Sequence, residues 1–149
     1  MIDISLHIYD IAQNAIDAGA DHIFISILKN RFVISDNGCG MDEQTKKSAC
    51  IKGFTTRKNG RGGNGLYLLW CNAESLTVLS AKGIGTLIDA RFPDTFPEGE
   101  ISLTLRLLRS CYPEIAWIFT IYDQNAQFTL DTRAERRDCM KEETRNENP

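Results

Sequence analysis

Hydrophobic and polar positions alternate with different periods along the chain. Apolar residues recur every three or four positions over residues 3–18, which predicts a helix, and Gly19 is well placed to end it. The β-rich runs HIFISIL and RFVIS are separated by the dipeptide KN and predict a hairpin. SLTVLSA and TLIDARF, joined around KGIG, predict a second hairpin. The first 92 residues therefore read as alternating helical and β-hairpin segments.

The second half of the chain adds shorter elements. GLYLLWCNA predicts a short helix from about Leu66, with Leu66, Leu69, Trp70 and Ala73 along one side. Residues 99–111 predict another helix, which Pro113 closes. AWIFTIY and QFTLDT, joined by DQNA, predict a third hairpin. Residues 133–149 are charged and poor in apolar side chains, so we expect a disordered tail.

Composition narrows the classes of protein to consider. A chain of 149 residues with 42% hydrophobic and 25% charged side chains suits one globular domain. No apolar run approaches the ~20 residues of a membrane helix, and the first ten residues lack the basic start of a signal peptide. The five cysteines are odd in number and show no CxxC spacing, which favours reduced thiols. We expect a cytoplasmic protein with no membrane partner.

The first predicted helix carries a polar stripe of His7, Asp10, Asn14 and Asp17. Offsets of three or four residues place these side chains on one side of a helix. One interpretation is a solvated face. The other is a site in which Asp10 holds a water and the Asn14 amide oxygen binds a hard cation such as Mg²⁺.

A second candidate is the polar segment from Asp42 to Asn64, which lacks periodicity and predicts a loop. It ends in GRGGNG just before a helix, where backbone N–H groups form a favourable anion site. A solvated loop that is merely basic is the competing interpretation, and nucleic-acid binding is disfavoured because no aromatic platform accompanies the charges. No apolar strand precedes GRGGNG, so the dinucleotide-binding fingerprint does not apply. The basic residues of the segment are Lys46, Lys47, Lys52, Arg57, Lys58 and Arg61.

The stretch VISDNGCGM places Asp36 at the end of an apolar run, followed by Gly38 and Gly40. A tight surface turn would explain this pattern. So would a ligand pocket in which a carboxylate and bare backbone meet a flat molecule.

Four segments taken in order resemble the ATP-binding domain of the GHKL family, which includes DNA gyrase, Hsp90, histidine kinases and MutL. They are YDIAQNAIDAGADHI, DNGCGM, GFTTRKNGRGGNGL and GIGT, and they lie within residues 4–92. The resemblance implies an α/β (α+β) two-layer sandwich of the Bergerat type, with a mixed, mostly antiparallel sheet and helices on one face. It further implies a core over residues 1–92 with a lid at 42–64. The predicted helix and hairpin of residues 93–132 lie outside these motifs, and we expect them to form an extension packed on that core.

The resemblance also implies roles for individual residues toward ATP or ADP and Mg²⁺. Asp36 would accept a hydrogen bond from the adenine amino group, and Asn14 would bind the metal. Asp10 would be the catalytic base, at a position where gyrase-type members carry a longer glutamate, so slow hydrolysis is expected. Asp17 would be either a ligand or a structural group. The remaining nucleotide-binding positions implied by the motifs are Gly38, Gly40, Met41, Thr55, Gly63, Gly65, Leu66 and Thr86.

The resemblance therefore implies a bacterial Mg·ATP-binding, histidine-kinase-like ATPase module that regulates a partner protein. An anti-sigma-type protein-serine kinase, a slow autonomous ATPase and a nucleotide-free interaction domain remain alternatives. The segment after Phe92 resembles the C-terminal part of small bacterial ATP-binding proteins, some of them linked with hydrogenase-type redox complexes. The partner is thus expected in a redox complex or a sigma/anti-sigma system, and no nucleic-acid partner is expected.

Overall fold

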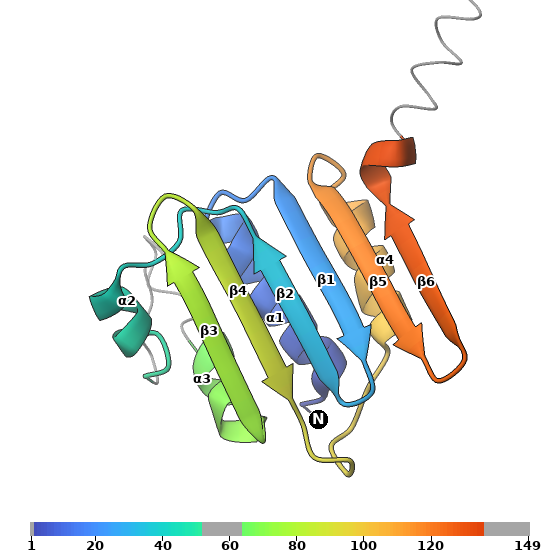
Figure 1. Cartoon of the computed structure of the whole chain (residues 1–149), viewed down its shortest axis with the longest axis horizontal. Helices are drawn as coiled ribbons and strands as arrows, with labels where there is room; N and C mark the ends of the chain where they lie inside the picture. The colour runs from blue at the N-terminus through green and yellow to red at the C-terminus, as the bar shows by residue number, and fades with distance from the viewer. Residues whose placement is uncertain (1, 52–63, 136–149) are drawn as a thin grey trace, which may run out of the picture.

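The computed structural model describes residues 2–51 and 64–135, and these residues form a six-stranded sheet with helices on one face (Figure 1). The strand order is β3-β4-β2-β1-β5-β6. Among the described strands, β1 and β5 run parallel and the other neighbours run antiparallel. The predicted two-layer fold with a mixed, mostly antiparallel sheet is confirmed. The strands are β1 (His22–Leu28), β2 (Arg31–Asp36), β3 (Ser75–Ala81), β4 (Gly85–Arg91), β5 (Ala116–Asp123) and β6 (Ala126–Asp131).

The three predicted hairpins form, and in two of them the turn residues adopt conformations that permit a reversal. Asn30 adopts a positive φ of 53° in the KN turn between β1 and β2, a conformation that asparagine tolerates better than most residues. Gly83 supplies the equivalent freedom between β3 and β4, with φ 81°. The conformational preferences of these turn residues explain why the two hairpins can be predicted from the sequence.

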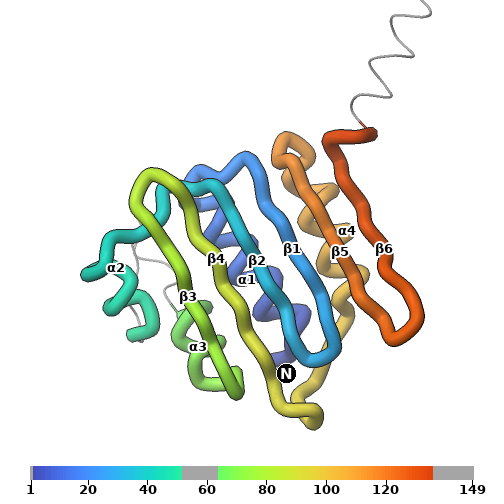
Figure 2. Tube along the Cα trace, in the orientation of Figure 1, coloured from blue at the N-terminus to red at the C-terminus, as the bar shows by residue number. Residues whose placement is uncertain are grey.

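The helix layer is centred on α1 (Ile4–Asp17), with α3 (Gly65–Asn72) on one side and α4 (Ile101–Cys111) on the other (Figure 2). Asp3 caps α1, because its Oδ1 accepts from the backbone N–H of Leu6 at 2.9 Å. The apolar side of α1 is buried against the sheet, with Ile8 fully covered.

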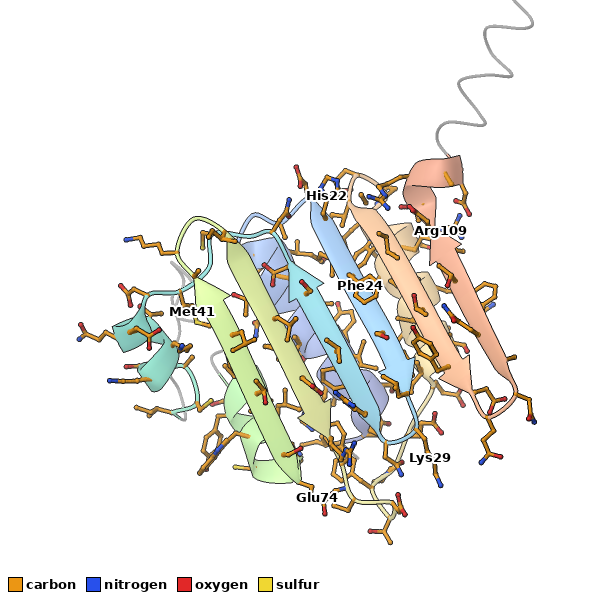
Figure 3. The ribbon with its side chains drawn as sticks, in the orientation of Figure 1. His22, Phe24, Lys29, Met41, Glu74 and Arg109 are labelled. Carbon is orange, nitrogen blue, oxygen red and sulfur yellow. The ribbon has the colours of Figure 1, made fainter. Side chains whose placement is uncertain are left out.

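Alternation along the strands separates two faces of the sheet. Ile23, Ile25 and Ile27 of β1 are buried under the helices, whereas Phe24 lies on the face without helices (Figure 3). Asp36 pairs directly with Ile23 across the β1–β2 ladder and therefore shares the helix-covered side. This register directs an acidic side chain at the end of β2 toward the helix layer.

Residues 93–132 contribute to both layers of the fold. Helix α4 contacts α1, and β5 lies beside β1, so that Trp117 sits opposite Ile23 with 0% of its surface exposed. The backbone N–H of Trp117 donates to Thr132 Oγ1 at 3.0 Å, which fixes the chain after β6. The sheet therefore continues from the first hairpin into the last one through a parallel pairing.

Two details of the sequence prediction are wrong. The predicted loop contains a helix, α2 (Glu43–Ser48), whose first turn is capped by Asp42 at 2.7 Å from Thr45 N. Helix α2 buries no residue, so its sequence shows no apolar periodicity from which a helix could be predicted. On α3, Trp70 does not join Leu66 and Leu69 in the interior but is 58% exposed, because the buried arc of this short helix is narrow.

Candidate functional site

Asp36 ends β2 with its carboxylate on the helix-covered side of the sheet. Its Oδ1 accepts from Gly38 N at 2.8 Å, and Thr86 is its direct partner on β4. Burial raises the pKa of Asp36, while backbone hydrogen bonds from Gly38 and Thr86 partly offset the rise. The chain thus holds a half-buried acid whose charge carries a desolvation penalty.

The loop after Asp36 is clamped between α1 and the β3–β4 turn. Cys39 donates its backbone N–H to Ala18 O at 2.9 Å and accepts from Gly83 N at 2.6 Å. Gly40 has φ 66°, and a Cβ there would lie 2.1 Å from Ala81 O. The second glycine of DNGCG is therefore required by the close approach of two backbone segments, whatever the pocket binds.

Gly38 and Gly85 make the same kind of close approach on either side of Asp36. A Cβ on Gly38 would lie 2.9 Å from Ala18 Cβ, and one on Gly85 would lie 2.0 Å from Asp36 O. Gly85 also has φ 147°, which L side chains rarely adopt. These glycines allow the acidic strand end, the end of α1 and the start of β4 to meet.

A hydroxyl that the sequence analysis did not select lies beside Thr86, in the same row across the sheet as Asp36. Ser80 Oγ is 2.8 Å from Thr86 Oγ1 and accepts from Met41 N at 2.8 Å. Its position on β3 follows from alternation, since Leu76 and Val78 share its side of the strand. The sequence signal for Ser80 is a polar residue at a position where alternation predicts an apolar one. This signal is weak, because it does not show which residue of the neighbouring strand the hydroxyl contacts.

The start of α3 lies against the polar side of α1. A Cβ added to Gly65 would lie 3.3 Å from Asp10 Cβ and 3.9 Å from Asn14 Nδ2. Asp10 is half-buried and Asn14 is exposed, while Leu66 next to Gly65 is buried. A helix N-terminus, a carboxylate and an amide therefore converge at one place.

The other two members of the polar stripe lie in different environments. His7 is 1% exposed, stacks on Phe92 at 5.6 Å between ring centroids, and its Nε2 is 3.0 Å from Asn72 Nδ2. Burial lowers the pKa of His7, and the nearby Asp3 partly opposes this change. Asp17 is exposed and accepts from Gln13 Nε2 at 3.2 Å. Of the polar stripe, only Asp10 and Asn14 therefore remain candidates for the functional site.

The end of α1 connects the two groups of candidate residues, one around Asp36 and the other around Asp10 and Asn14. Ala18 donates its backbone N–H to Asn14 O at 3.0 Å, and Ala18 O accepts from Cys39 N in the DNGCG loop. Predicted positions Thr55 and Gly63, with most of the predicted lid at 42–64, lie outside the described residues.

Residues 2–96 match the family model described as Histidine kinase-, DNA gyrase B-, and HSP90-like ATPase. The chain belongs to this GHKL family. Its sequence is 32% identical over 90 residues to the DNA mismatch repair protein MutL of Chloroherpeton thalassium (strain ATCC 35110 / GB-78). That alignment covers 57% of this chain but only 14% of the MutL sequence.

Two solved structures resemble the GHKL fold of this chain. The Aquifex aeolicus MutL ATPase domain complexed with ADP has a TM-score of 0.60 at 13% identity, covering 85% of this chain and 62% of that one. The N-terminal domain of a DNA repair protein has a TM-score of 0.57 at 14% identity, covering 88% of this chain and 53% of that one. These likenesses show the fold. No helix in the described residues is long and apolar enough to span a membrane.

Proposed function

We propose that this GHKL-family chain binds ATP or ADP with Mg²⁺ and regulates a partner protein, with phosphoryl chemistry that is slow or depends on that partner. The observation that carries the proposal is the Asp36 carboxylate, half-buried on the helix-covered side of the sheet at a desolvation penalty. A ligand N–H group would recover part of that penalty as a charge-assisted hydrogen bond. The adenine amino group is such a donor.

The other end of the site suits the phosphates. The N-terminus of α3 offers backbone N–H groups and a positive dipole end, which favour a bound anion. The Asn14 amide oxygen is the kind of hard ligand that Mg²⁺ prefers. Within the described residues no three His, Cys, Asp or Glu side chains gather, so the proposal assigns the remaining metal ligands to phosphate and water. When bound, Mg²⁺ would neutralise phosphate charge.

Asp10 is the proposed base for any phosphoryl chemistry. It is half-buried beside Gly65, at the helix start that we assign to the phosphates. An aspartate reaches one methylene less than a glutamate, and general base catalysis depends strongly on distance. This supports slow hydrolysis by the isolated chain. We further propose that the chemistry depends on a partner, a protein of a redox complex or of a sigma/anti-sigma system.

Calorimetry with ADP and MgCl₂ tests the nucleotide site. Asp36→Asn should lose roughly 1.5–3 kcal/mol of ADP binding, because a charged acceptor becomes neutral. Asp89→Asn is the matched control, because Asp89 lies on the opposite face of neighbouring β4, paired with Arg31 at 2.7 Å. Equal ADP affinity in the wild type and Asp36→Asn, or no ADP binding by the wild type, would contradict the proposal.

Labelled ATP tests the regulatory part. Little phosphate release by the pure chain and little label on any protein in a cell extract support a binding module. Label on a partner protein would instead indicate a protein kinase, and rapid release by the pure chain an autonomous ATPase. Asp10→Asn is expected to abolish either signal while leaving ADP affinity within about threefold of the wild type, since Asp10 is assigned to the reaction rather than to the purine.

A further inference from the structure

We propose that Ser80 is a positioning residue that fixes the hydrogen-bond direction of Thr86 and so makes the purine pocket select a 6-amino purine over a 6-oxo purine. This inference rests on the proposed nucleotide site and deepens it. It concerns the part of the pocket where the ends of β2, β4 and β3 lie side by side, with Asp36, Thr86 and Ser80 in one row across the three strands.

Ser80 makes three polar contacts through one hydroxyl group. Met41 donates its backbone N–H to Ser80 Oγ at 2.8 Å. Ser80 Oγ lies 3.1 Å from Gly85 O and 2.8 Å from Thr86 Oγ1. The hydroxyl is half-buried, so satisfying these contacts matters more than it would in open solvent.

Counting protons decides the direction of the contact between the two hydroxyls. A serine hydroxyl donates one hydrogen bond and accepts two. Met41 N–H uses one lone pair of Ser80, and Gly85 O can only accept, so the single Ser80 proton belongs on Gly85 O. The remaining lone pair of Ser80 then accepts the proton of Thr86. This arrangement satisfies all three contacts, whereas the reverse direction leaves Ser80 without a proton for Gly85 O.

The consequence is that Thr86 presents lone pairs, and no proton, to the pocket. The carboxylate of Asp36, the direct partner of Thr86 on β2, offers acceptor oxygens as well. Two adjacent acceptors suit the two hydrogens of a 6-amino group, directly or through a bridging water. The 6-oxo group of hypoxanthine or guanine would face them with its own lone pairs, which leaves acceptors unpaired and is disfavoured.

The test compares ADP with inosine diphosphate, whose base carries an oxo group at the 6-position and a proton on N1, by calorimetry on the full chain with MgCl₂. The wild type is expected to prefer ADP. In Ser80→Ala the Thr86 hydroxyl is released and can donate, so the ratio of the two dissociation constants should fall roughly five- to tenfold, the worth of about one hydrogen bond. Ser80→Thr keeps the hydroxyl and should retain most of the preference. Ser35→Ala is the matched control, a half-buried serine next to Asp36 on the opposite face of β2.

A double-variant cycle separates this role from a purely structural one. If Ser80 acts through Thr86, then Ser80→Ala should not change the ratio further in a Thr86→Val background. A structural role would weaken both nucleotides equally and leave the ratio unchanged in Ser80→Ala, which would overturn the inference while the nucleotide site stands. Absence of ADP binding by the wild type would overturn both.

Discussion

At the residue scale, the fold perturbs the protonation of two buried or half-buried groups, Asp36 in the candidate site and His7 outside it. Asp36 is held so that burial raises its pKa, whereas burial lowers the pKa of His7. The two shifts have opposite consequences for stability. Asp36 favours the folded state at lower pH and His7 favours it at higher pH, because each prefers to be neutral in the interior.

The Asp36 shift predicts a stability gain on neutralisation. The folded pKa of Asp36 lies above the ordinary 3.8, so the folded chain binds the proton more tightly than the unfolded chain. The stability of the fold therefore decreases as the pH rises from 3.8 through the folded pKa. In the absence of nucleotide, Asp36→Asn should therefore have an equal or higher melting temperature than the wild type at pH 7. Thermal unfolding between pH 4 and pH 8 measures this. A clearly lower melting temperature at pH 7 would show that the carboxylate stabilises the empty fold.

The His7 shift predicts loss of stability in acid. The folded pKa lies below the ordinary 6.5, so the unfolded chain takes up the proton first, and stability falls as pH drops below 6.5. Asp3 faces His7 and weakens the effect without reversing it. His7→Leu should lose less stability than the wild type between pH 7.5 and pH 5, measured by urea unfolding. An identical pH dependence in the two proteins would refute the prediction.

At the scale of elements, the site is formed by three segments that approach through backbone. The DNGCG loop contacts the end of α1 on one side and the β3–β4 turn on the other, and glycine occupies the points of closest approach. Ser80 and Met41 then connect this loop to β3. The pocket geometry depends on these contacts as much as on the side chains that would touch a ligand.

Gly40→Ala tests this dependence. The added Cβ would meet Ala81 O at 2.1 Å in a backbone conformation with φ 66°, so a loss of about 1–3 kcal/mol in unfolding free energy is expected, together with weakened ADP binding. Gly19→Ala is the control, since Gly19 also has a positive φ of 80° but open space around its Cβ position. Equal losses in the two variants would show that close packing at Gly40 is unimportant.

At the scale of the whole molecule, the family match ends at residue 96 while the sheet continues beyond it. Strand β5 pairs with β1 in the middle of the sheet, and Trp117 is buried there without exposed surface. Helix α4 packs against α1 and buries Leu105 and Leu108. The later elements are thus part of the same hydrophobic core as the candidate site.

A fragment of residues 1–96 is therefore expected not to fold cooperatively. Removing β5 and α4 would expose the buried isoleucines of β1 and leave that strand as an open edge. Circular dichroism during heating should show no sigmoidal transition for the fragment and a clear one for the full chain. Trp117→Ala in the full chain, which should lose about 3–5 kcal/mol, tests the same core with a milder change. A cooperative transition in the fragment would refute the prediction.

The sequence by itself determined the elements whose signals are local. The turn-forming dipeptide KN between two apolar runs specified the first hairpin, and helical spacing with Gly19 specified the first helix. Four motifs in the expected order specified the family. Sequence alone also selected Asp36, because it ends an apolar run, and Asp10 and Asn14, because they lie on the polar stripe of the first helix.

Tertiary structure decided everything that depends on contacts between distant residues. It placed β5 beside β1, buried His7 against Phe92 and left Trp70 exposed. It also brought Ser80 next to Thr86, since neither β3 nor β4 alone shows which hydroxyls share a row. Periodicity reports which side of an element is apolar, but the partner of each side is chosen by packing of the complete chain, and that choice determines which polar groups converge.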